Sequence, residues 1–108
     1  MVVQLKVIFL GTSSSVPTKK RGLASIAVKR GGEYILFDAG ECVQRAMIHT
    51  GLGLNHPMKV FITHLHGDHC VGLLGLLQSV SMMHRDKMLS IYGPKGIVGF
   101  VNSNIKAL

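Results

Sequence analysis

The sequence lacks any apolar stretch long enough to cross a membrane. Its longest uninterrupted apolar run, Cys70 to Leu77, contains two glycines and falls far short of the roughly 20 residues that a spanning helix requires. Only Lys6 precedes the first short apolar stretch, and no small-residue cleavage pattern follows it, so a secretory signal is not expected. These absences predict a cytoplasmic protein that does not enter a membrane.

Cysteine and acidic residues are also scarce. The two cysteines, Cys42 and Cys70, are too few for a disulfide framework and match no thiolate zinc pattern, so we expect both to be reduced, small apolar residues. Five acidic side chains stand against twelve basic ones, giving a formal charge of +7. This charge favours a polyanionic partner such as RNA, DNA or an anionic surface, although solubility and chance composition explain it equally well.

Apolar residues are abundant instead. They make up 47% of the 108 residues, only 16% are charged, and the mean hydropathy is +0.37, which is unusually apolar for a soluble protein. The length suits one domain, or part of one, spanning residues 1–108, but is short for an enzyme built around a binuclear metal site. The composition therefore predicts an apolar surface that something else must cover.

The spacing of apolar residues predicts one unit that begins with strands and then alternates strands with helices. Val3, Leu5, Val7 and Phe9 alternate with other side chains, which is typical of a half-buried strand. Glycines at 31 and 32 suit a tight turn between two β-prone runs, which predicts an antiparallel pair. The remaining expected elements are the paired strands at 23–29 and 33–37, further strands at 59–62 and 89–92, and helices at 41–50, 71–83 and 96–108.

The strongest chemical signal is the segment Thr63-His64-Leu65-His66-Gly67-Asp68-His69, which follows a predicted strand. In an extended chain His64 and His66 point to the same side, so they can share a metal ion. Gly67 permits a sharp bend that brings Asp68 and His69 back towards the same point. Imidazole and carboxylate are ligands of catalytic zinc, which keeps one position open for water. A cluster of surface histidines is the less probable interpretation of this pattern, and other metals accept the same ligands.

This segment resembles the signature of the metallo-β-lactamase superfamily, and the surrounding sequence resembles its tRNA 3′-processing branch, ribonuclease Z. The supporting segments are Phe9 to Pro17 with Arg21 beyond it, Leu36 to Glu41 with Gln44-Arg45 after it, Gly72 to Leu77, and Ile91 to Gly96. The resemblance implies an α/β fold, the metallo-β-lactamase-type αβ/βα sandwich. This chain would form its amino-terminal half, a mixed sheet with flanking helices.

The resemblance also implies a site and a reaction. His64 and His66 would bind one Zn²⁺, and Asp68 and His69 a second, giving two zinc ions in the complete site. Asp68 would in addition be the catalytic proton acceptor for the attacking water. The reaction would be hydrolysis of a phosphodiester just past the acceptor stem of precursor tRNA, leaving a 3′-hydroxyl, and the complete enzyme would be a homodimer.

Other polar residues have two open interpretations each. Ser13, Ser14 and Arg21 are candidates for substrate binding, with the backbone amides of residues 13–15 offered to an anion, but an ordinary solvated loop is the alternative. Asp38 is a candidate for orienting a metal-binding histidine, or equally a turn carboxylate that caps the next helix. Glu41 is expected in the first turn of that helix, where it would offset the helix dipole.

The sequence departs from the family in ways that limit the expectation. Cys42 stands where a glycine is expected in a Gly-Glu-Gly turn, Gly22 where an asparagine is usual, and Leu74 where a proline is usual. The family's remaining metal ligands and its tRNA-gripping arm would come after residue 108, so we expect this chain to be incomplete and inactive or very weak alone. Two alternatives stay open: another hydrolase of the same fold, acting on a phosphodiester, sulfate ester, lactone or thioester, or a noncatalytic metal-binding or interaction fragment.

Overall fold

The computed structural model describes residues 4–84 and 86–107, so the predicted positions Val3 and Leu108 lie outside the described residues. The elements in chain order are β1 (Leu5–Gly11), β2 (Ser25–Arg30), β3 (Glu33–Phe37), α1 (Val43–His49), β4 (Met58–Phe61), α2 (Gly67–Cys70), α3 (Gly72–Met82), β5 (Leu89–Tyr92) and α4 (Ile97–Lys106).

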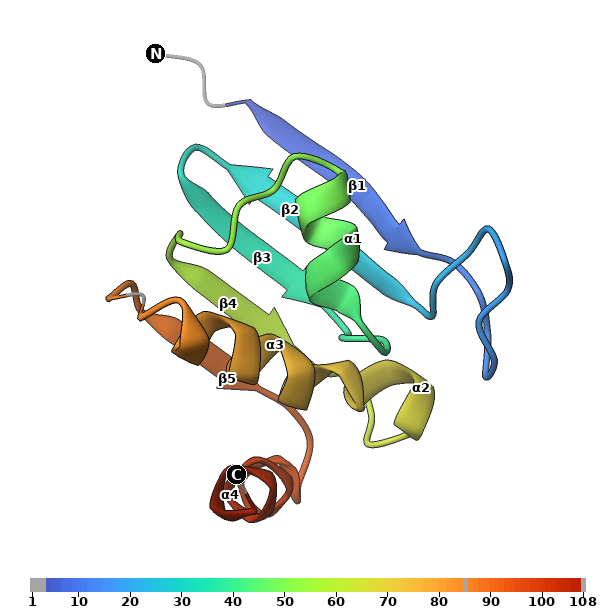
Figure 1. Cartoon of the computed structure of the whole chain (residues 1–108), viewed down its shortest axis with the longest axis vertical. Helices are drawn as coiled ribbons and strands as arrows, with labels where there is room; N and C mark the ends of the chain where they lie inside the picture. Colours follow the sequence, from blue (N-terminus) through green and yellow to red (C-terminus); the bar gives the residue numbers. More distant parts are fainter. Residues whose placement is uncertain (1–3, 85, 108) are drawn as a thin grey trace.

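The five strands form one mixed sheet in the order β1-β2-β3-β4-β5 (Figure 1). β1, β2 and β3 pair antiparallel, whereas β3, β4 and β5 run parallel. The turn between β2 and β3 places Gly31 at a φ of 57°, a conformation that glycine adopts without steric cost. The antiparallel pair predicted from the sequence is therefore confirmed, and the connections that carry helices lead to the parallel strands, as chain geometry requires.

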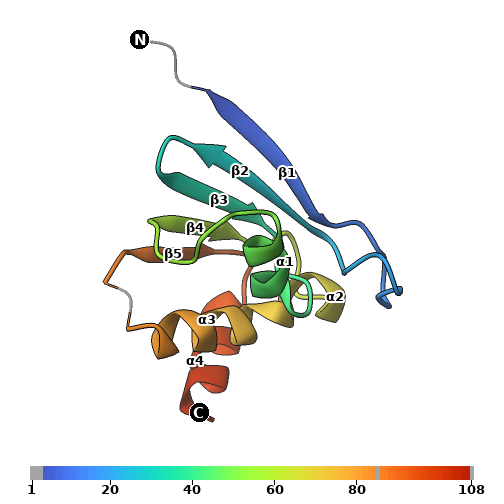
Figure 2. The ribbon, with the colours of Figure 1, turned by 45° about the horizontal axis from the view of Figure 1, so that its top comes forward.

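One face of the sheet is covered by helices. α1 lies over β2 and β3 and α3 lies over β4 and β5, both on the same side of the sheet (Figures 1 and 2). The centre of this core is fully buried: Leu36 and Val60 from the sheet, Met47 from α1 and Leu76 from α3 are each 0% exposed. α4 lies next to α3 beyond β5 (Figure 1) and contributes the buried Ile97.

The other face of the sheet is open within the described residues (Figure 2). Strand register aligns one apolar or aromatic residue from each strand across this face, namely Phe9, Ile26, Phe37, Phe61 and Tyr92. The outer members of this row are well exposed, with Phe9 at 65% and Tyr92 at 47%. Ring centroids 4.8 Å apart stack Phe61 on Tyr92. The apolar surface that the composition predicted is this sheet face.

Two helix expectations need correction. The helix expected at 71–83 is confirmed as α3, but a separate short helix, α2, forms before it and includes residues 67–69 of the His-rich loop (residues 63–69). Glu41 does not lie in the first turn of α1, since that helix begins at Val43 after Cys42, and the first turn holds no acidic residue. Within the described residues, none of the helices has the length and hydropathy of a membrane-spanning segment.

Candidate metal centre

The His-rich loop leaves the sheet at the carboxyl end of β4, beside the end of β3. The Asp38 amide donates to the Phe61 carbonyl (2.8 Å), so the segment after β3 lies against the end of β4. The Ile62 amide donates to the Tyr92 carbonyl (2.8 Å), which holds the start of the loop against β5. The carboxyl ends of parallel strands are where sheets of this kind bind ligands.

The loop brings the histidines of the motif together. His66 is extended, with φ −101° and ψ 137°, and stands directly before α2, which carries Asp68 and His69. The ring of His64 lies 4.2 Å from that of His69 and 5.7 Å from that of His66, measured between centroids. Residues that come from an extended segment and from the following helix thus face one another, as the bend at Gly67 predicted.

Asp68 lies between two of these histidines. Its Oδ1 is 3.2 Å from His66 Nδ1 and its Oδ2 is 3.5 Å from His69 Nε2. The Ser15 amide donates to Oδ2 (3.0 Å), and this hydrogen bond is the main cause that lowers the pKa of the Asp68 carboxyl. Partial burial opposes the lowering, while His69 and His66 add to it. Asp68 is therefore held as a carboxylate that faces two imidazoles.

The fit of this cluster to a metal ion rests on its chemistry. Among residues 4–84 and 86–107, no group of three His, Cys, Asp or Glu side chains is arranged to hold a metal ion as it stands. However, Asp68 Oδ1 is buried and has no hydrogen-bond partner, because the nearby His66 nitrogen does not meet it in hydrogen-bonding geometry. A buried oxygen without a donor requires an explanation, and coordination of a metal ion would provide one. Together with imidazole nitrogens, such an oxygen fits a zinc ligand set.

Asp38 and Thr63 stand behind the cluster. Asp38 Oδ2 lies 2.7 Å from His69 Nδ1, and its other oxygen accepts from the Thr63 amide (2.8 Å). No side chain caps α1, so these contacts favour the histidine-orienting interpretation of Asp38 over the capping one. Thr63 is part of the motif, but the sequence alone predicts no role for it. Its hydroxyl contacts depend on the fold and carry no sequence signal.

The loop between β1 and β2 approaches the same site. Ser15 adopts a positive φ of 62° and gives its amide to Asp68, while the Ser13 amide donates to the Gly22 carbonyl. The expectation that residues 13–15 offer their amides to an outside anion is therefore wrong for Ser13 and Ser15, because these amides already have partners within the protein. Ser14 is exposed, and the Arg21 guanidinium donates to Thr12 Oγ1 (3.0 Å).

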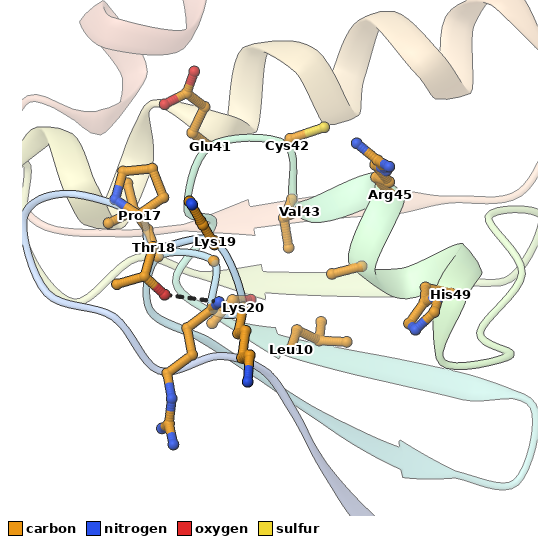
Figure 3. Close-up of a pocket in the computed structure, with 15 residues that line it drawn as sticks. Leu10, Pro17, Thr18, Lys19, Lys20, Glu41, Cys42, Val43, Arg45 and His49 are labelled. Atoms are coloured by element: carbon orange, nitrogen blue, oxygen red, sulfur yellow. Dashed lines mark hydrogen bonds between the residues drawn. The ribbon is translucent and has the colours of Figure 1, made fainter.

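The far end of this loop forms a cavity of about 530 Å³ with α1. Figure 3 shows Lys19 and Lys20 of the loop and Arg45 and His49 of α1 along it, with Glu41 near its rim. Lys19, Lys20 and Arg45 are exposed, so their charges face solvent. Lys19, Lys20 and Arg45 thus gather around one cavity, and Ser15 of the same loop contacts Asp68 of the His-rich loop, residues 63–69.

A family model described as "Anti-Pycsar protein Apyc1" matches residues 5–104. The chain belongs to this family. Curated relatives carry another name: the chain is 55% identical over 104 residues to "Ribonuclease Z" of Nitrosopumilus maritimus, covering 96% of this chain and 35% of that protein. It is 47% identical to "Ribonuclease Z" of Methanocaldococcus jannaschii, covering 97% of this chain and 33% of that protein. The chain therefore spans about a third of the length of these relatives.

Solved structures confirm the fold. The short form of human tRNase Z superposes with a TM-score of 0.86 at 38% identity, covering 94% of this chain and 39% of that one. The metallo-β-lactamase fold protein YhfI of Bacillus subtilis gives a TM-score of 0.76 at 23% identity, covering 92% and 41%, which supports the fold alone. The resemblance to ribonuclease Z and the metallo-β-lactamase-type fold predicted from the sequence are both confirmed.

Proposed function

We propose that the protein of which this chain is a part is a zinc-dependent endoribonuclease that cleaves precursor tRNA at its 3′ end. The observation that carries the proposal is the position of Asp68, whose two carboxylate oxygens face different histidines of one loop. The relatives named ribonuclease Z supply the reaction class, hydrolysis of an RNA phosphodiester. The site and the names point to the same chemistry.

The motif residues would divide between two zinc ions. His64 and His66 would hold one, Asp68 and His69 the other, and Asp68 would also accept a proton from the attacking water. When bound, zinc polarises phosphate oxygens and lowers the pKa of water. The contribution of the chain is to keep Asp68 ionised, through the Ser15 amide, and to keep it at the face of the histidines.

The basic surface would bind the RNA. Lys19, Lys20 and Arg21 lie on the loop whose other end touches Asp68, so a phosphate backbone that follows this loop would reach the metal centre. Ser14 and Arg21 remain candidate contacts, and Ser13 would act by shaping the loop through its bond to the Val16 carbonyl. The excess of basic residues supports a polyanionic substrate over a small neutral ester.

The proposal extends to the longer protein. The four ligands of this chain are few for two catalytic zinc ions with about three protein ligands each, so further ligands would come from the rest of the protein. The same region would cover the open sheet face, whose exposed row includes Phe9 and Phe37. We also propose a cytoplasmic homodimer, on the basis of the resemblance to ribonuclease Z.

A second candidate is a noncatalytic module that pairs through this open face, which such an exposed apolar surface favours. Another hydrolase of the same fold is a third. The oligomeric state of the chain in solution tests the noncatalytic module. A monodisperse monomer would contradict pairing through the open face, whereas association that Phe9→Lys abolishes would support it.

The test of the main proposal compares zinc binding by the chain with that of two matched variants, His66→Asn and His84→Asn. His66 belongs to the cluster, whereas His84 is exposed after α3 at a φ of 51°, a conformation that asparagine tolerates. We expect zinc affinity to fall at least about tenfold in His66→Asn and to remain unchanged in His84→Asn. Equal affinities, or no zinc in the unaltered chain, would contradict the metal centre.

Substrate class is tested on the same samples with precursor tRNA and bis(4-nitrophenyl) phosphate. Binding of precursor tRNA that weakens steeply with salt supports an RNA substrate. Hydrolysis of the small diester without any binding of tRNA would instead favour another phosphodiesterase of the same fold.

A further inference from the structure

One buried carboxylate contacts two separate parts of the His-rich loop. Asp38 follows β3 with a φ of 64° and is 7% exposed. Its Oδ2 lies 2.7 Å from His69 Nδ1 on α2. Its Oδ1 accepts the Thr63 amide (2.8 Å), and the Thr63 hydroxyl lies 3.0 Å from Oδ1 and 2.9 Å from Oδ2. Every one of these partners is at or next to a proposed metal ligand.

The contact with Asp38 decides which ring nitrogen of His69 carries the proton. A carboxylate only accepts hydrogen bonds, so the bond at 2.7 Å requires a proton on His69 Nδ1. In the neutral ring this leaves Nε2 with the free lone pair. That nitrogen is the one that faces Asp68 Oδ2 at 3.5 Å.

The same reasoning reaches His64 through Thr63. The Thr63 hydroxyl has a single proton, and it also lies 2.8 Å from His64 Nδ1. Since Asp38 offers no proton, the hydroxyl donates to the carboxylate and can only accept from the histidine. His64 Nδ1 must therefore be the donor, and its Nε2 holds the free lone pair.

We propose that Thr63 is a positioning residue that transmits the orientation set by Asp38 to His64, so that one carboxylate fixes the tautomers of His64 and His69 together. The inference rests on the proposed function, in which both histidines bind metal. Both rings then present Nε2 to the site, before any metal arrives. Among the described residues, the His66 ring makes no hydrogen bond to Asp38 or Thr63, and its Nδ1 faces Asp68 instead, which makes it an internal reference.

The experiment uses two variants of Thr63 in the metal-free chain. Thr63→Val keeps the branched shape and removes the hydroxyl, whereas Thr63→Ser keeps the hydroxyl. Long-range ¹H–¹⁵N spectra of chains labelled on histidine, recorded at about pH 8.5 where ordinary imidazole is neutral, report which nitrogen of each ring is protonated. His66 and the exposed His49 are the reference rings.

We expect His64 and His69 to be protonated at Nδ1 in the unaltered chain and in Thr63→Ser. In Thr63→Val, His64 should lose its fixed tautomer and His69 should keep it, because Asp38 still holds that ring. An unchanged His64 in Thr63→Val would overturn the proposal. A simultaneous change at His69 would also overturn it, since the hydroxyl would then support the whole loop and not one ring.

Zinc affinity, measured by competition with a chromophoric chelator, gives the second readout. Loss of a group that orients a metal-binding histidine typically weakens metal binding 10- to 100-fold, so we expect a loss of about that size in Thr63→Val and recovery in Thr63→Ser. Equal affinities would overturn the role of Thr63 in metal binding. If no chain binds zinc while the tautomers follow the expected pattern, the metal centre fails and the proton arrangement stands, so the two proposals fail separately.

Discussion

The two faces of the sheet have similar apolar content and opposite environments. On the covered face the row Leu36, Val60 and Ala27 is at most 1% exposed, because α1 and α3 pack against it. One position away on each strand, the open face carries a row whose member Phe9 is 65% exposed. Strand alternation assigns residues to faces, but the covering of a face depends on elements elsewhere in the chain.

The comparison extends to the His-rich loop, which is hydrogen-bonded to elements of the covered side. The Ala39 amide donates to the His69 carbonyl (2.8 Å), and the Gly72 amide donates to the Ala39 carbonyl (2.9 Å). The turn after β3 is thereby fixed to α2 and α3 and keeps Asp38 beside His69. Within the described residues, no side chain of the open-face row is hydrogen-bonded to the site, so side-chain changes on the two faces should have very different consequences.

The largest contrast is expected between two identical substitutions on opposite faces. Leu36→Ala removes a side chain that is 0% exposed, and Leu5→Ala removes one that is 61% exposed on the open side of β1. We expect Leu36→Ala to lower the free energy of unfolding by about 2–5 kcal/mol and Leu5→Ala to change it by about 0.5 kcal/mol or less. Urea denaturation measures both, and similar losses would mean that the open face is packed in solution.

A smaller contrast is expected between two glycines. A Cβ at Gly72 would lie 1.8 Å from the Gly40 carbonyl oxygen, whereas a Cβ at Gly99 in α4 would meet nothing within 4 Å. Gly72→Ala must push α3 away from the turn that carries Asp38, at a cost of about 1–3 kcal/mol or more, and should weaken zinc binding as well. Gly99→Ala should stabilise the chain by about 0.5–1 kcal/mol through helix propensity. Thermal unfolding and zinc titration of the two variants test this, and a harmless Gly72→Ala would show that the contact is loose.

Much of the architecture could be predicted because it is encoded locally. Alternation in β1, the glycines of the hairpin and the helical spacing of α3 depend only on neighbouring residues. The break between α2 and α3 could not be predicted, because it lies where the Gly72 amide donates to the carbonyl of Ala39, far away in the sequence. Similarly, Glu41 was placed in a helix that in fact begins after Cys42.

The metal motif was visible for the same local reason, whereas its supporting contacts were not. His64 to His69 form one short segment, so their spacing alone indicated a common site. The bond from Ser15 to Asp68 joins residues 53 positions apart, and the Thr63 hydroxyl acts through its distance to Asp38, 25 positions away. For Asp38, the sequence left two equal alternatives, orienting a histidine or capping the next helix, and it predicted no role for Thr63. Neither contact leaves a pattern in a single sequence.

The smallest expected effect concerns the turn that leads from the sheet into the covering layer. Cys42 has a φ of 61° and a ψ of 32°, a left-handed conformation that costs a residue with a Cβ about 1–2 kcal/mol. This is also the position where the family resemblance led us to expect glycine. Cys42→Gly removes that cost but gives the unfolded chain more conformational entropy, which favours unfolding by about 0.4–1 kcal/mol. We therefore expect a net stabilisation of roughly 0.5–1 kcal/mol.

The control is Gly31→Ala in the hairpin, where φ is 57° and a Cβ meets nothing within 4 Å, so that only the backbone conformation opposes the change. Urea unfolding should show opposite signs for the two variants, and a destabilised Cys42→Gly would mean that the cysteine side chain contributes a contact that outweighs the conformation it imposes.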